Sequence, residues 1–213
     1  MSNEPQEKDE IELDTTNAAQ RRTLIWVLLI NLTQAVVIGM VGWWANSTGL
    51  MGAALDNLAD GLVYAVSIYA VGRSMLAKAR AARLSALFLW VLAIGLLIEV
   101  IRRFVAGGEP IGMIMIIAAI ANAATNWFCL KLLRSHRKEG VHFQSSWIFT
   151  ANDMATNAGI ALSGIAVMFF QSPLPDLLIG LVVVTIAFKG GMEIWEKTRN
   201  ANTEEVSASD EKN

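Results

Sequence analysis

Six long apolar stretches constrain the fold of this chain more than any other feature of the sequence. They cover residues 24–45, 49–72, 84–105, 111–133, 145–170 and 174–195. A helix needs about 20 apolar residues to cross the hydrocarbon core of a bilayer, whereas a barrel strand needs only about 9–11 alternating ones. Because the stretches are long and continuous, the sequence predicts an all-α membrane protein, a bundle of six transmembrane helices.

Charged residues are scarce and unevenly placed, which supports the same conclusion. They make up 17% of the chain, against roughly a quarter in a typical soluble domain. Nine of them fall in residues 1–22 and eight in residues 196–213. We therefore divide the chain into a polar N-terminal tail (1–22), a six-helix transmembrane domain (23–197) and a polar C-terminal tail (198–213). No basic face for nucleic acid is present, and the single cysteine excludes an intramolecular disulfide.

Lysines and arginines in the short loops set the expected orientation of the bundle. They are frequent next to the first stretch, in the loops after the second and fourth stretches, and after the sixth. The opposite side carries only Arg102 and Arg103. Both termini are therefore predicted to be cytoplasmic. We expect a multi-pass protein of the lipid bilayer, located in a bacterial inner (cytoplasmic) membrane.

Three aspartates lie well inside the apolar stretches, away from their ends, where a bilayer disfavours charge. Asp56 and Asp60 belong to the second stretch, and Asp153 belongs to the fifth. An ionised side chain at the bilayer centre costs about 2.5–3.5 kcal/mol even on insertion scales, so such residues typically face a watery cavity or a cation. Asp56 and Asp60 share one helix face because they are four residues apart, and so do Asp153 and Asn157.

These two pairs suit a divalent cation. Carboxylate and amide oxygens are ligands for such ions, and water completes the shell. Metal binding displaces protons from carboxylates, so protons and metal compete for one place. The predicted metal ligands are Asp56, Asp60, Asp153 and Asn157, with no catalytic residue and no resident cofactor. A static hydrogen-bond network is the alternative role for the two aspartates of the second stretch, and interhelical hydrogen bonding is the alternative role for Asn157.

Other polar residues in the apolar stretches are weaker evidence for a cation site. Asn31 and Gln34 in the first stretch, with Asn122 and Asn126 in the fourth, either line the same cavity or form hydrogen bonds between helices. We favour hydrogen bonds for most of them. Glu99 is expected to pair with Arg102 or Arg103, three or four residues later, in a structural role.

Three segments resemble motifs of the cation diffusion facilitator family. Ser47–Asp60 is similar to the second-helix motif, Ala151–Asn157 to the fifth-helix motif, and Pro175–Gly180 to the entry of the sixth helix. The resemblance extends over about residues 24–197. It implies six helices with both termini inside and efflux of a divalent cation in exchange for protons by alternating access. It also implies a homodimer.

Two departures from the family pattern affect these expectations. The three aspartates match family ligand positions, but the residue four before the fifth-helix aspartate is Phe149, where the family usually has His or Asp. Asn157, Asn152 or a water would then supply the fourth ligand. Without an imidazole nitrogen, the predicted ligands are all oxygen atoms, which are hard Lewis bases. We expect zinc or cadmium as the transported ion, with manganese or iron as alternatives.

The second departure concerns the end of the chain. Only about 18 residues follow the sixth stretch, so we expect the cytoplasmic metal-binding domain of the family to be absent. The homodimer would then form through the transmembrane helices.

Two other classes of protein stay open as alternatives. CDP-alcohol phosphatidyltransferases are six-span enzymes with aspartates spaced by four, but their motif reads Asp-Gly-x-x-Ala-Arg. Here Asp60 and Gly61 are followed by Leu-Val-Tyr-Ala, without the arginine. A non-transporting, metal-sensing membrane protein is compatible with the same aspartates. The sequence favours a transporter over an enzyme.

Overall fold

A computed structural model describes residues 4–70, 75–134 and 141–210, and side chains are described over 21–66, 68–69, 79–132 and 153–196. Throughout the described residues the regular structure is helical, which confirms the all-α prediction. In chain order the helices are α1 (Glu4–Trp44), α2 (Thr48–Ala70), α3 (Met75–Ala106), α4 (Gly112–Arg134), α5 (Val141–Phe170) and α6 (Leu174–Asp210).

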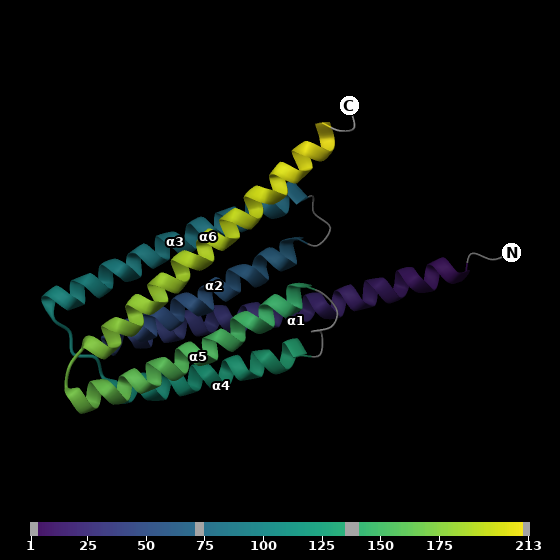
Figure 1. The fold of residues 1–213 in the computed structure, drawn as a ribbon. Coiled ribbons are helices and arrows are strands. Elements are labelled where there is room, and N and C mark those ends of the chain that lie inside the picture. Colours follow the sequence, from purple (N-terminus) through teal and green to yellow (C-terminus); the bar gives the residue numbers. More distant parts are fainter. Residues whose placement is uncertain (1–3, 71–74, 135–140, 211–213) are drawn as a thin grey trace.

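Consecutive helices run antiparallel, so α1 begins and α6 ends at the same end of the bundle (Figure 1). We call this the terminal end and the opposite one the far end. The closest pairs of helices are α1 with α2, α4 with α5, and α3 with α6. Helix α2 contacts each of the other five helices, which makes it the centre of the bundle.

Five helices contain segments that are long and apolar enough to cross a membrane. These segments are Arg21–Trp44, Ala79–Ala106, Gly112–Leu132, Asp153–Phe170 and Leu174–Glu196. Helix α2 has 23 residues but is not among them, since Asp56, Asn57 and Asp60 occupy its middle. A helix enclosed by five others does not face lipid, and it tolerates polar residues that a lipid-facing helix would not. The chain is an integral membrane protein with α2 inside the bundle.

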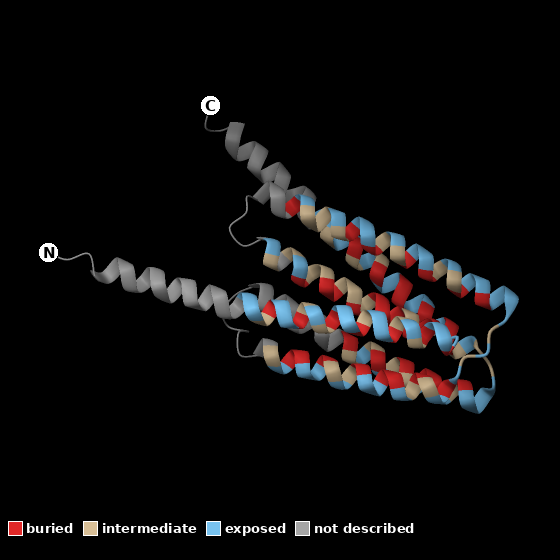
Figure 2. Ribbon diagram, turned by 180° about the vertical axis from the view of Figure 1, so that it is seen from behind, coloured by how far each residue is buried: buried red, intermediate tan, exposed pale blue. Residues whose placement is uncertain are grey.

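The burial pattern agrees with a lipid environment. Buried residues line the inward faces of the helices, and the outward faces carry the exposed ones (Figure 2). Many exposed side chains are large and apolar, including Val36 on α1 (61% exposed) and Phe169 on α5 (80% exposed). Exposed apolar surface of this extent is typical of helices that contact lipid or a partner.

Residues in the left-handed region end three helices. Asn46 follows α1 with φ 52°, Gly107 follows α3 with φ 78°, and Gln171 follows α5 with φ 49°. A residue in this conformation turns the chain away from the helix axis, and glycine adopts it without steric cost. All three caps lie at the far end, where they shorten the connections between antiparallel helices.

Small residues set the close approaches of α2. A Cβ atom at Gly52 would lie 3.0 Å from Val183 of α6, and one at Gly61 would lie 3.2 Å from Leu32 of α1. Helices α2 and α5 also touch, but these two glycines face α6 and α1.

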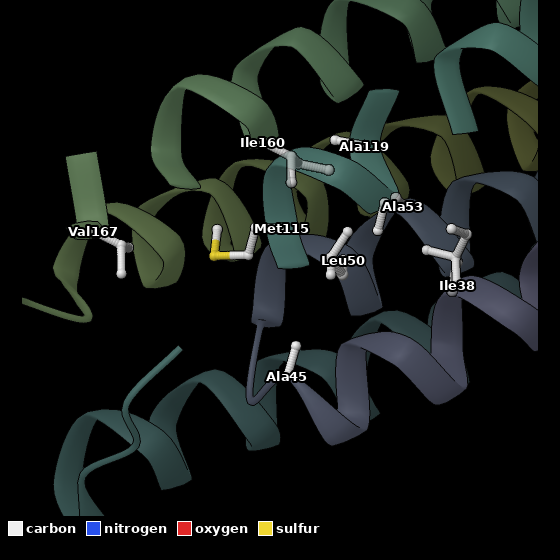
Figure 3. Packing of buried hydrophobic residues seen from close by; sticks show 10 residues of the cluster. Ile38, Ala45, Leu50, Ala53, Met115, Ala119, Ile160 and Val167 are labelled. Carbon is white, nitrogen blue, oxygen red and sulfur yellow. The ribbon is translucent and has the colours of Figure 1, made fainter. Parts of the chain in front are cut away.

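Two apolar clusters lie on either side of the buried polar residues along the length of the bundle. The larger cluster lies toward the far end and joins α1, α2, α4 and α5 through residues such as Ile38, Leu50, Met115 and Ile160 (Figure 3). A smaller cluster toward the terminal end contains Leu24, Val27, Tyr64 and Cys129. A band of buried polar side chains from the same four helices lies between the two.

Candidate functional site

Eight buried polar residues form this band, which we call the polar layer. Helices α1, α2, α4 and α5 contribute two each, and every member is at most 8% exposed. The members are Asn31, Gln34, Asn57, Asp60, Asn122, Asn126, Asp153 and Asn157. Because each helix places residues three or four apart on its inward face, the four pairs meet inside the bundle.

The structure brings the predicted aspartates of α2 and α5 together. Asp60 and Asp153 are 4% and 7% exposed, and their carboxyl groups lie close enough to interact electrostatically. Asp56, one turn from Asp60, is half-buried and lies within electrostatic range of Asp153. Two buried carboxyl groups at this proximity require a proton or a cation between them.

No three His, Cys, Asp or Glu side chains of the described residues lie close enough to form a metal-binding group by themselves. Amide oxygens or waters would therefore have to complete a coordination shell around the aspartates. Asp56, Asp60, Asp153 and Asn157 stay a prediction as ligands.

Asn157 is hydrogen-bonded through both atoms of its amide. Its Nδ2 donates to the backbone oxygen of Asp153 at 2.8 Å, and its Oδ1 accepts from Asn122 Nδ2 at 3.1 Å. This arrangement corresponds to the interhelical role described above as its alternative. The side chains of Phe149 and Asn152, the other residues considered at this position, lie outside the described residues.

Asn31 Nδ2 donates to the backbone oxygen of Val27 in its own helix at 2.9 Å, whereas the other amides of the polar layer are linked to one another. Gln34 Nε2 donates to Asn122 Oδ1 at 2.6 Å and to Asn126 Oδ1 at 2.9 Å. Asn57 Nδ2 donates to Asn122 Oδ1 at 3.0 Å, and Asn126 Nδ2 points to Asp153 Oδ2 at 3.4 Å. The prediction of interhelical hydrogen bonds is confirmed for Gln34, Asn122 and Asn126. Since the network ends on Asp153, these residues also surround the candidate site.

Asp176 is a buried acidic residue whose role the sequence did not reveal. It lies in the first turn of α6, is 1% exposed, and binds the start of α2. Its carboxylate accepts from Ser47 Oγ and the Thr48 amide at 2.6 Å each, and from Gly49 N at 3.0 Å. A carboxylate at a helix N-terminus satisfies free amide groups and interacts favourably with the helix dipole. Asp176 thereby fixes the beginning of α2, two turns before Asp56.

The pairing of Glu99 is confirmed, and it lies away from the polar layer. Glu99 contacts Arg102 at 2.7 Å and Arg103 at 2.6 Å near the end of α3. The Arg103 side chain is only 3% exposed, whereas that of Arg102 is 55% exposed. The acidic residue and its two neighbours thus form a local structural group at the far end.

Comparison with known families independently supports the resemblance to cation transporters. The family model of the cation efflux transmembrane domain matches residues 24–200, which is most of the chain and includes α2 to α5 together with parts of α1 and α6. No curated protein matches the chain. The match covers the three segments that resemble family motifs, together with the polar layer between them. The chain therefore belongs to the cation efflux family, whose members are transporters of cations rather than enzymes.

Proposed function

We propose that this protein exports a divalent transition-metal cation across the membrane in exchange for protons. Zinc or cadmium is the expected ion, with manganese or iron as alternatives. The observation that carries the proposal is the pair of buried aspartates, Asp60 and Asp153, on two helices of a bundle that belongs to a cation efflux family. Neither of them forms an ion pair with Lys or Arg within the described residues.

Proton coupling follows from this lack of a fixed positive partner. Two neighbouring carboxylates cannot both stay ionised in an apolar enclosure without compensation. Protons compensate them when the site is empty of metal, and a divalent cation displaces those protons when it binds. In this scheme, release of the cation on one side requires uptake of protons from that side. One site thus exchanges metal for protons.

Alternating access requires the helices to move as groups around the site. The closest contacts join α3 with α6 on one side, and α1 with α2 and α4 with α5 on the other. We propose that the α3–α6 pair shifts against the four helices that hold the polar layer. Helix α2 contacts both groups and carries Asp56 and Asp60, so the movement would change access to these carboxylates.

The remaining features of the proposal concern the whole assembly. We propose a homodimer formed through exposed apolar helix faces, both termini in the cytoplasm, and a location in a bacterial inner membrane. The start of α1 and the end of α6 both lie at the terminal end of the bundle, which supports placing the two termini on one side of the membrane (Figure 1).

Transport by the purified protein in proteoliposomes tests the proposal. With an acidic lumen, we expect zinc uptake and a matching loss of the proton gradient, followed by a pH-sensitive dye. Asp60→Asn and Asp153→Asn should each abolish both signals, because the amide can neither release a proton nor neutralise the ion. Thr33→Val alters an exposed residue of α1 and should leave both signals intact. Undiminished uptake in both aspartate variants would contradict the site assignment.

The same measurement separates the alternatives. A phosphatidyltransferase or a metal sensor would not move protons in response to a metal gradient. Metal-driven proton movement by the purified chain alone is specific to a coupled transporter.

A further inference from the structure

Within the part of the chain whose side chains the structure describes, four oxygen atoms of the polar layer have no hydrogen-bond donor. They are Asn31 Oδ1, Gln34 Oε1, Asn57 Oδ1 and Asp60 Oδ2, and each side chain is at most 8% exposed. A buried acceptor without a donor costs about 1–3 kcal/mol, so native structures contain few of them and each one needs an explanation. Here all four belong to α1 and α2 and lie in the layer that contains Asp60 and Asp153.

The backbone of α5 determines which way the amides around these atoms point. The backbone oxygen of Asp153 can only accept, so Asn157 must present Nδ2 to it and Oδ1 to Asn122. Asn122 must then donate through Nδ2 and accept through Oδ1. Gln34 and Asn57 both meet that Oδ1, and each must therefore present its nitrogen. The assignment of oxygen and nitrogen in these amides is thus fixed by the network.

A second branch gives the same orientation for Gln34. Asn126 points Nδ2 toward the Asp153 carboxylate, and its Oδ1 accepts from Gln34 Nε2 at 2.9 Å. Both branches leave the oxygen of Gln34 without a partner. The orphaned oxygens of Gln34 and Asn57 are therefore a consequence of the network and not of an arbitrary amide rotation.

The amide groups of Gln34 and Asn57 are neighbours in the polar layer, which also contains Asp60 and Asp153. The nitrogens of both amides lie within 3.0 Å of the same atom, Asn122 Oδ1, so the two amide groups are neighbours. Asp60 is three residues after Asn57 on the same helix face, and its own Oδ2 has no donor. Asp153 lies within electrostatic range of Asp60 and also receives the Gln34–Asn126 branch.

We infer that the amide oxygens of Gln34 and Asn57 are ligands of the transported cation, next to Asp60. This inference rests on the proposed function and specifies its ligands and its cation class. The resulting ligand set contains carboxylate and amide oxygens only. Such sets suit hard divalent cations such as Mn²⁺, whereas zinc also uses nitrogen and sulfur ligands.

The inference accounts for the sequence departure at the fifth helix. Phe149 replaces a ligand that the family usually provides from α5. Gln34 and Asn57 lie on α1 and α2, so they would supply oxygens from helices other than α5. With these oxygens as ligands, the site would bind Mn²⁺ in addition to zinc and cadmium.

The test compares two metals in two nearly isosteric variants. Gln34→Met and Asn57→Leu remove the amide while preserving the side-chain volume, and Thr33→Val is the matched control on α1. Transport of Mn²⁺ and of Zn²⁺ is measured in proteoliposomes, and the affinity for Mn²⁺ is measured by electron paramagnetic resonance on the purified protein. We expect the ratio of kcat/KM for Mn²⁺ over Zn²⁺ to fall about 10-fold in each variant. Mn²⁺ affinity should fall by a similar factor.

A third variant separates coordination from hydrogen bonding. Gln34→Glu keeps an oxygen but loses the Nε2 donor that binds Asn122 and Asn126. If Gln34 is a ligand, Gln34→Glu should retain the Mn²⁺ preference that Gln34→Met loses. An equal fall for both metals in Gln34→Met and Gln34→Glu would show a purely structural amide and overturn the inference.

Other outcomes are also decisive. An unchanged metal ratio in Gln34→Met and Asn57→Leu would mean that ordered water satisfies the orphaned oxygens, and it would overturn the inference. Should Gln34→Met not elute as a folded protein, Asn57→Leu and Gln34→Glu carry the same comparison. Absence of metal-driven proton movement in the unmodified protein would contradict the proposed function, whereas the Mn²⁺ affinities would still decide the ligand role.

Discussion

Asp153 is the residue at which the interactions of the polar layer converge. Its carboxyl group lies within reach of Asp60, its Oδ2 faces Asn126, and its backbone oxygen holds Asn157. Loss of a side chain that orients a metal ligand typically lowers metal affinity by about 10–100-fold. We therefore assign Asn126 a positioning role for Asp153.

Replacement of Asn126 tests this role. Asn126→Leu removes the donor to Asp153 and the acceptor for Gln34 while preserving volume. We expect KM for zinc to rise roughly 10-fold, with a smaller change in kcat, because the carboxylate stays present but is less well oriented. Uptake rates over a series of zinc concentrations measure the two constants separately. A selective loss of kcat with unchanged KM would contradict a positioning role.

The residues of the site were predictable from the sequence only in part. Asp56, Asp60 and Asp153 stood out because charge inside an apolar stretch is costly. Asn57 carries no charge, and its buried, inward orientation depends on α1 and α4, which the local sequence does not specify. The role of Asp176 depends on a contact with Ser47 and Thr48, more than 120 residues earlier in the chain.

At the scale of helices, α2 is the element on which the account depends. It contacts every other helix, carries two of the aspartates, and begins on the Asp176 carboxylate. Each contact at its first turn restricts the position of the whole helix. A loss at this point should therefore affect stability and transport together.

Asp176→Ala should lower the free energy of unfolding by about 2–3 kcal/mol, because it leaves buried donors at Thr48 and Gly49 unsatisfied. Thermal unfolding in detergent measures this change. Glu109→Ala, an exposed acidic residue near the same end, is the control and should leave Tm unchanged. Equal Tm values for both variants would show that the Asp176 contacts do not stabilise the fold.

Helix boundaries differed from the apolar stretches for a physical reason. The fourth stretch, 111–133, nearly coincides with α4, but α3 begins at Met75, nine residues before the third stretch. Hydropathy reports the part of a helix that lies in the hydrocarbon. Helical structure continues beyond it, here through a segment rich in Ala, Arg and Leu, which are good helix formers. For α2, conversely, the polar residues of the site lower the hydropathy of a helix that is fully formed.

At the scale of the whole molecule, the proposed orientation places the terminal end in the cytoplasm and the far end outside. The chain contains one cysteine, Cys129, which is buried, so introduced thiols report on their own positions. In intact cells, a membrane-impermeant maleimide should label Ser172→Cys in the connection between α5 and α6. Ser207→Cys should be labelled only after permeabilisation. The reverse pattern would contradict the proposed orientation.

The central claim is that a divalent cation binds at Asp60 and Asp153 by displacing protons. Proton release on addition of Zn²⁺ to the purified protein, in weakly buffered solution with a pH indicator, measures this exchange without transport. The account predicts proton release in the unmodified protein. It predicts none in the Asp60→Asn, Asp153→Asn double variant, whose amide groups have no ionisable proton that the metal could displace. Equal proton release from both proteins, or none from the unmodified protein, would contradict the account.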